Sequence, residues 1–219
     1  MIDSATTQPH AKARSIRGFS LIELLAVVVI IMVLAAVAIP SIGTLMQNYR
    51  LSGDVQAITG QIQLARTRAA SDFTHARLYV DLAANTYHLE TWNKAGGCWK
   101  TEADSVNACT QATSPVIPLS PGDTFGFGTL KSGPTAATAT IAQAPVCTTG
   151  VAGAAPGANI ANTACIEFNS RSFPVDSTDA LVAGDAIYFS NNANPTAIAV
   201  SIAGRPSAFI YSGSAWASF

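Results

Sequence analysis

Residues 17–40 read RGFSLIELLAVVVIIMVLAAVAIP, and this stretch decides the fold. No polar residue occurs from Leu24 to Ile39. A helix over residues 19–39 would be about 30 Å long at 1.5 Å per residue, which matches the hydrocarbon thickness of a bilayer. We therefore predict a transmembrane or assembly helix over residues 19–40, and a single pass through the membrane.

The first 18 residues are polar, and their charged residues are mostly basic. Lys12, Arg14 and Arg17 are opposed only by Asp3, a charge bias that is typical of the cytoplasmic flank of a membrane helix. A secretory signal peptide would place a small-residue cleavage site after its apolar core, and none is evident here. We therefore do not expect cleavage after the core.

Glu23 is the anomaly of the apolar run. A carboxylate buried in apolar surroundings without a partner costs several kcal/mol or becomes protonated. The run itself contains no cation, so the partner must come from a neighbouring chain or from a new amino terminus. Cleavage between Gly18 and Phe19 would create such a terminus.

The segment Arg17–Glu23, RGFSLIE, resembles the prepilin peptidase motif of type IV pilins and type II secretion pseudopilins. The resemblance implies that the leader is cut after Gly18, that Phe19 becomes N-methylated, and that Glu23 pairs with the amino terminus of a neighbouring subunit. Pro40 stands where many members of this family have a proline, which would remove a helix hydrogen bond and permit a local kink.

The same resemblance implies an organisation and a location. We expect a leader peptide over residues 1–18, the membrane and assembly helix over 19–40, an amphipathic continuation over 41–72, and a β-rich globular head over 73–219. The expected location is the bacterial inner membrane with the head in the periplasm, followed by incorporation into a pilus or pseudopilus. The expected partners are prepilin peptidase and other pilins or pseudopilins. The alternative is an ordinary signal anchor with an incidental Glu23.

After Pro40, apolar residues recur three and four positions apart, as they do on one face of a helix. They are Leu51, Val55, Ile58, Ile62, Ala65 and Ala69. We predict that the helix continues to about Ser71 and packs this face on a sheet. Arg50, Asp54, Arg66 and Arg68 lie off the stripe, and we interpret Arg66 and Arg68 as a solvated face rather than as contacts to a ligand or filament.

From Arg77 onward the period changes to two, which predicts a β-hairpin with strands around residues 78–82 and 87–91. Further strands are predicted over 138–143, 165–169, 186–190, 197–202 and 208–211. The stretches 93–121 and 143–164 are rich in Gly, Ala, Thr, Asn and Pro and are predicted to be surface loops. The fold class is therefore α+β: a long N-terminal helix packed against a mainly antiparallel sheet, as in pilins.

The chain contains four cysteines, Cys98, Cys109, Cys147 and Cys165, and no CxxC pair. An even number suits an oxidising compartment. Sequence proximity favours pairing Cys98 with Cys109 and Cys147 with Cys165, although four cysteines allow three connectivities and buried free thiols are the alternative.

The layout of one long helix, an early hairpin, late strands and the terminal Gly204, Arg205 and Pro206 resembles the GspH/FimT pseudopilin family. Some FimT-like pilins contact DNA through a Gly-Arg-x-Arg motif near the C-terminus. Here Gly204 and Arg205 match, but Ser207 replaces the second arginine. Arg205 is therefore a candidate DNA contact if it shares a basic surface with Arg171 and Lys131, and otherwise a residue that caps a turn.

Other chemistry is not indicated by the sequence. Charged residues make up 11% of the 219 residues and the formal net charge is -1, so no general attraction to nucleic acid is expected. His10, His75 and His88 lack zinc-ligand spacing, Gly126 and Gly128 lack the rest of a phosphate loop, and no nucleophile elbow occurs. We expect no metal, no cofactor and no enzymatic activity.

The predicted function is that of a minor pilin or pseudopilin, a structural subunit. The alternative is a tip module that contacts DNA, and a tethered enzyme is a remote alternative. The choice between a type IV pilus and type II secretion stays open.

Overall fold

The computed structural model describes residues 19–102, 104, 109, 116–138, 140–154, 157–191 and 194–219, apart from the side chains at positions 37–41 and 44. The chain divides into two compact units, Met1–Leu45 and Met46–Phe219. Helix α1, Leu21–Ser71, contributes to both units. Its end at Ser71 is where the apolar stripe stops, and the prediction of that boundary is confirmed.

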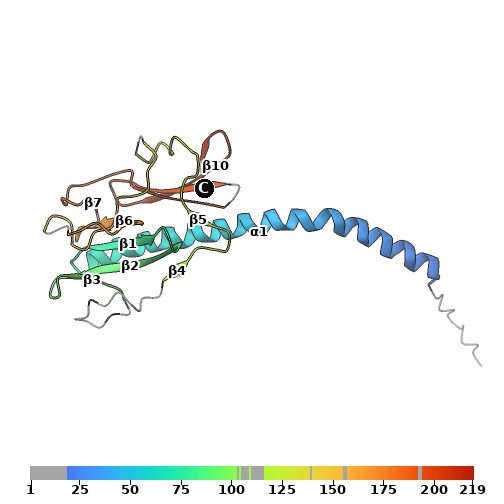
Figure 1. Cartoon of the computed structure of the whole chain (residues 1–219), viewed down its shortest axis with the longest axis horizontal. Helices are drawn as coiled ribbons and strands as arrows, with labels where there is room; N and C mark the ends of the chain where they lie inside the picture. Colours follow the sequence, from blue (N-terminus) through green and yellow to red (C-terminus); the bar gives the residue numbers. More distant parts are fainter. Residues whose placement is uncertain are drawn as a thin grey trace, which may run out of the picture. The chain divides into compact units, whose positions relative to one another are not determined.

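The second unit contains two antiparallel sheets (Figure 1). The first has the strand order β3-β2-β1-β6-β7, with β4 also paired to β2, and the second has the order β11-β10-β9-β8-β5. The strands of the first sheet are β1 (Ala76–Asp81), β2 (Thr86–Asn93), β3 (Cys98–Lys100), β4 (Ile117–Pro118), β6 (Thr163–Phe168) and β7 (Pro174–Val175). Those of the second are β5 (Thr124–Phe125), β8 (Ala186–Ser190), β9 (Pro195–Val200), β10 (Pro206–Tyr211) and β11 (Trp216–Ser218).

The main core lies where α1 meets both sheets. Each residue of the predicted helix stripe is at most 3% exposed, for example Ile58 and Ile62 at 0%. Leu78 of β1 pairs with Leu89 of β2 and with Ile166 of β6, and all three belong to this core. Because successive strand side chains alternate between faces, the period of two in the hairpin supplies one apolar face for the helix. The predicted α+β, pilin-like fold is confirmed.

The prediction of a strand over residues 138–143 is wrong. The described residues of that stretch form no strand. The side-chain amide of Gln143 instead binds the backbone of β8, donating to the carbonyl of Tyr188 (2.7 Å) and accepting from its N–H (2.9 Å). Ile141 packs on a second apolar cluster with Tyr188. In this stretch, Ile141 covers the second sheet with its side chain, and the described residues do not pair with that sheet as a strand.

Candidate functional site

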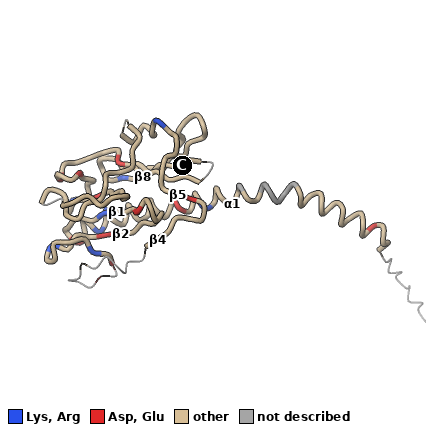
Figure 2. Tube along the Cα trace, viewed as in Figure 1, with Lys and Arg blue, Asp and Glu red and all other residues tan. Residues whose placement is uncertain are grey.

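The first unit presents an uncovered apolar surface over the residues that follow the leader motif. We call residues 19–45 the assembly segment. Among the described residues of this segment, the large apolar side chains are exposed, including Phe19 at 81%, Leu21 at 82% and Ile22 at 74%. Figure 2 shows one acidic position in the coloured part of this segment, and the sequence of residues 19–45 contains no other charged residue. An apolar surface of this kind requires a lipid or protein environment to cover it.

Glu23 is that acidic position and lies in the first turn of α1. The Ser20 carbonyl starts the helix by accepting from the N–H groups of Glu23 (3.0 Å) and Leu24 (3.1 Å). A carboxylate in the first turn interacts favourably with the positive end of the helix dipole, typically by 0.3 to 1 kcal/mol. That gain is smaller than the several kcal/mol that burying an unpaired carboxylate costs, so Glu23 needs a further cationic partner when the segment is covered.

Two other positions predicted to be functional, Gly18 and Pro40, are only partly covered by the described residues. Gly18 and the basic residues before it lie outside the described residues, as does the side chain of Pro40. The backbone of α1 is helical through position 40. Among the residues that the structure describes, none of the helices is long and apolar enough to cross a membrane. The membrane-spanning role of residues 19–40 thus stays a prediction.

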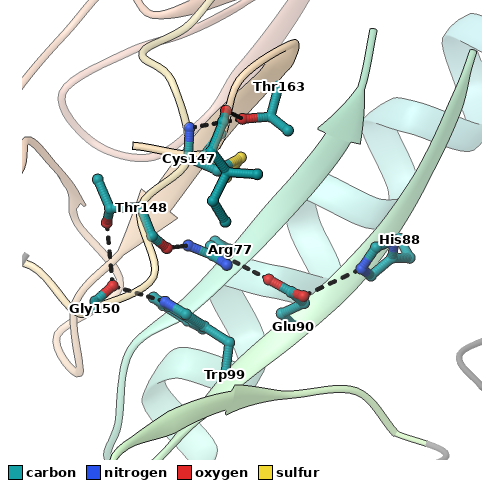
Figure 3. Close-up of a disulfide and its surroundings, with 10 residues drawn as sticks. Arg77, His88, Glu90, Trp99, Cys147, Thr148, Gly150 and Thr163 are labelled. Carbon is teal, nitrogen blue, oxygen red and sulfur yellow. Dashed lines mark hydrogen bonds and ion pairs between the residues drawn. A yellow bond between two sulfur atoms is a disulfide. The ribbon is translucent and has the colours of Figure 1, made fainter. Parts of the chain in front are cut away.

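The head contains two disulfides, Cys98–Cys109 and Cys147–Cys165, with Cα–Cα distances of 5.8 and 5.0 Å. These are the two pairings that sequence proximity favours. The second disulfide joins β6 to the loop that follows position 144, and the N–H of Cys147 donates to the Thr163 hydroxyl (3.1 Å). This loop covers the face of the first sheet that points away from α1 (Figure 3).

Arg77 lies under that loop and was not singled out by any sequence pattern. Its Nε donates to Glu90 (2.6 Å), its Nη1 donates to the Thr148 carbonyl (2.7 Å), and its guanidinium stacks 4.0 Å from the ring centre of Trp99 (Figure 3). Both charged side chains are 1% exposed. Desolvation lowers the pKa of Arg77, while the negative charge of Glu90 opposes that shift. The cluster is a structural anchor that fixes the disulfide loop on the sheet.

The two histidines of the head, His75 and His88, each contact a glutamate of the first sheet. His75 pairs with Glu167 (2.9 Å) and His88 with Glu90 (3.2 Å). Within the described part of the chain, no group of three or more His, Cys, Asp or Glu side chains could hold a metal ion.

Arg205 lies in an open pocket of about 600 Å³ together with Arg66, and its other lining residues are Gln63, Thr67, Ala70, Ser172 and Pro206. The pocket is not lined by Arg171 or Lys131, the two cations whose place beside Arg205 was the condition for a DNA contact. The backbone of Arg205 closes the β9–β10 turn, because its carbonyl accepts from the Ser201 N–H (3.0 Å) and its N–H donates to the Ser201 hydroxyl (3.2 Å).

Gly204 brings this turn close to the helix. Its φ is +73°, and a Cβ there would lie 2.8 Å from the Ser172 carbonyl oxygen and 3.0 Å from Nε of Arg66. A larger residue would be strained in this conformation and would push the turn off Arg66. The pocket therefore depends on Gly204. Its lining includes the arginines Arg66 and Arg205, which are far apart in the sequence.

Comparison with known families supports the role of the N-terminal segment. Residues 13–39 match the family model described as the prokaryotic N-terminal methylation motif. No curated protein and no solved structure matches the chain.

The motif and the helix-on-sheet fold together indicate a type IV pilin-like protein. More specifically, the motif indicates a pilin or pseudopilin that prepilin peptidase processes and that assembles with other pilins. It implies a precursor anchored in the inner membrane and a structural role for the protein, without enzymatic activity.

Proposed function

We propose that the protein is a minor pilin or pseudopilin of the GspH/FimT kind, cut between Gly18 and Phe19 and methylated at Phe19. The exposed apolar surface of the assembly segment, with Glu23 as its one charge, carries this proposal. The segment spans the inner membrane in the precursor and packs among the same segments of neighbouring subunits in the filament. The disulfide-linked head stays in the periplasm.

The chemistry of Glu23 explains the order of these steps. Cleavage before Phe19 releases a protonated amine four residues before Glu23 in the sequence. In the filament, the amine of one subunit neutralises Glu23 of its neighbour, so that two charges enter apolar surroundings as a pair. The pair fixes the axial register, since only one offset between helices brings the two groups together.

Processing gives the direct test of this proposal. Co-expression with a prepilin peptidase should yield a chain that begins at Phe19 and has one added methyl group, while expression without it should yield the uncut chain. Intact-mass measurement and N-terminal sequencing distinguish the two products. An identical product with and without the peptidase, or a cut elsewhere, would leave a signal anchor and contradict the proposal.

A second candidate function is contact with DNA by the head. The Arg66–Arg205 pocket favours it, since no acidic side chain lines the pocket and arginine is suited to bidentate contact with phosphate. The net charge of -1 weighs against strong general affinity. Structural assembly therefore remains the main proposal.

Charge removal in this pocket tests the second candidate. If the pocket binds DNA, Arg66→Gln with Arg205→Gln should weaken binding to short duplex DNA by about tenfold or more and reduce the salt slope by about two. Fluorescence anisotropy of the detergent-solubilised chain measures both quantities. Lys131→Gln with Arg171→Gln is the control, since it removes the same number of positive charges outside the pocket lining. Equal losses in the control and the pocket variant would show general charge attraction, and no binding of the wild type at low salt would reject the function.

A further inference from the structure

Two buried acids meet where α1 passes the segment between β4 and β5. Asp54 of α1 is 7% exposed and Asp123 is 6% exposed. Both are held on Ser120, which donates to the Asp54 carboxylate and accepts from the Asp123 N–H through its carbonyl (3.0 Å). Asp54 lies off the apolar stripe of α1, and the segment after β4 buries it there.

The surrounding donors decide which acid is charged. Asp54 accepts from the backbone N–H of Ser120 (2.9 Å) and from its hydroxyl (3.0 Å). Oδ2 of Asp123 is buried and has no hydrogen-bond partner among the described residues. A carboxylate with two donors is stabilised in its ionised form, whereas one without donors is not. Ionising two neighbouring buried carboxyl groups is costly, and the group without donors on its buried oxygen keeps the proton, which therefore resides on Asp123.

The other titratable groups near the pair do not remove the need for this proton. Arg50 of α1 lowers the pKa of Asp123, but burial, the hydrogen bond to Asp54 and the charge of Asp54 outweigh it and raise that pKa to about 7. Tyr87 of β2 stays neutral, because burial and then the charge of Asp54 raise its pKa to about 12.

The segment that the pair holds connects three parts of the head. Its β4 end pairs with β2 of the first sheet, and its β5 end pairs with β8 of the second sheet. Asn85, in the β1–β2 turn, accepts from the N–H of Leu119 through its carbonyl (3.0 Å) and from the N–H of Phe125 through its side chain (2.9 Å). Residues 117–125 thus link α1 to both sheets.

We propose that Asp54 and Asp123 share one proton and form a pH-sensitive latch that holds residues 117–125 on α1. Loss of the proton places two negative charges in contact away from water, and the segment loosens. The inference is independent of processing and assembly, since all of these residues lie in the second unit.

The direction of the pH effect follows from the proton balance. The unfolded chain releases the Asp123 proton near its ordinary value of 3.8, and the folded chain keeps it to about 7. The folded state therefore binds more protons over this range, and its stability falls as the pH rises from about 4 through 7. Above pH 7 the full loss is reached.

Thermal unfolding of the full chain in detergent, followed by circular dichroism between pH 5 and 8.5, tests the latch. The Tm of the wild type should fall across this range, whereas Asp123→Asn, which keeps a donor and carries no charge, should show a much flatter profile. Asp179→Asn is the matched control, since Asp179 is exposed and its φ of +65° also suits asparagine. It should follow the wild type.

A second measurement keeps the proposal testable if Asp123→Asn does not fold. In wild-type protein labelled with ¹³C at the aspartate carboxyl groups, the Asp123 signal should titrate near neutral pH. Titration of Asp123 near its ordinary value, or equal pH profiles for the wild type and Asp123→Asn, would overturn the latch.

Discussion

Replacing Glu23 by alanine is expected to remove the subunit from filaments while leaving it in the membrane. Without the carboxylate, the amine of the neighbouring subunit enters apolar surroundings unpaired. Breaking a buried ion pair by removing one partner costs roughly 3–5 kcal/mol, which corresponds to a hundredfold or more in an equilibrium constant. The measurement compares the amount of subunit in sheared filaments with the amount in carbonate-washed membranes.

Two variants separate the charge of Glu23 from its size. Glu23→Gln retains the shape and should show the same assembly defect as alanine, whereas Glu23→Asp retains the charge and should assemble in part. Processing of all three variants by prepilin peptidase serves as a control for correct insertion. Recovery of normal amounts of the Glu23→Ala subunit in filaments would contradict the proposed register.

The second large effect is expected in the head, at Arg77. Arg77→Ala removes the guanidinium that pairs with Glu90, binds the Thr148 carbonyl and stacks on Trp99. Because Glu90 then stays buried without its cation, the free energy of unfolding should fall by about 3–5 kcal/mol. Urea denaturation of the detergent-solubilised chain, followed by tryptophan fluorescence, measures the loss.

The control for this prediction is Arg171→Ala, since Arg171 is exposed and should change stability by less than about 0.5 kcal/mol. Replacing both partners, Arg77→Met with Glu90→Leu, should recover much of the loss, because no buried charge remains unpaired. Equal stability of Arg77→Ala and the wild type would show that the ion pair contributes nothing to holding the disulfide loop.

The helix and the first hairpin could be predicted because their signals are local. The stripe from Leu51 to Ala69 has helical spacing, and each of its residues is buried in the structure. The hairpin around Leu78 and Leu89 has the period of a strand with one buried face. Short strands such as β3 and β4 lie in the stretch predicted as loop, because pairing with β2 decides their conformation and their own composition does not.

The buried polar residues could not be predicted, because loops distant in sequence bury them. Arg77 alternates with the core residues of β1 and so belongs on the outer face, which would be solvated without the loop that Cys147 and Cys165 hold there. Asp54 is buried by a segment that begins more than sixty residues later in the sequence. Arg66 and Arg205 line the same pocket because the β9–β10 turn brings Arg205 to α1. Alternation and periodicity describe one element at a time and contain no information about such coverage.

The strand orders of the two sheets have a consequence for how the head folds. In the second sheet, β8, β9, β10 and β11 pair in chain order, so most of its contacts form between residues close in sequence. In the first sheet, β1 must pair with β6, for example Leu78 with Ile166, across a long intervening chain. Closing a long loop costs entropy before any contact compensates for it. The four strands β8–β11 are therefore expected to pair quickly. The pairing of β1 with β6 is expected to limit the rate at which the head folds.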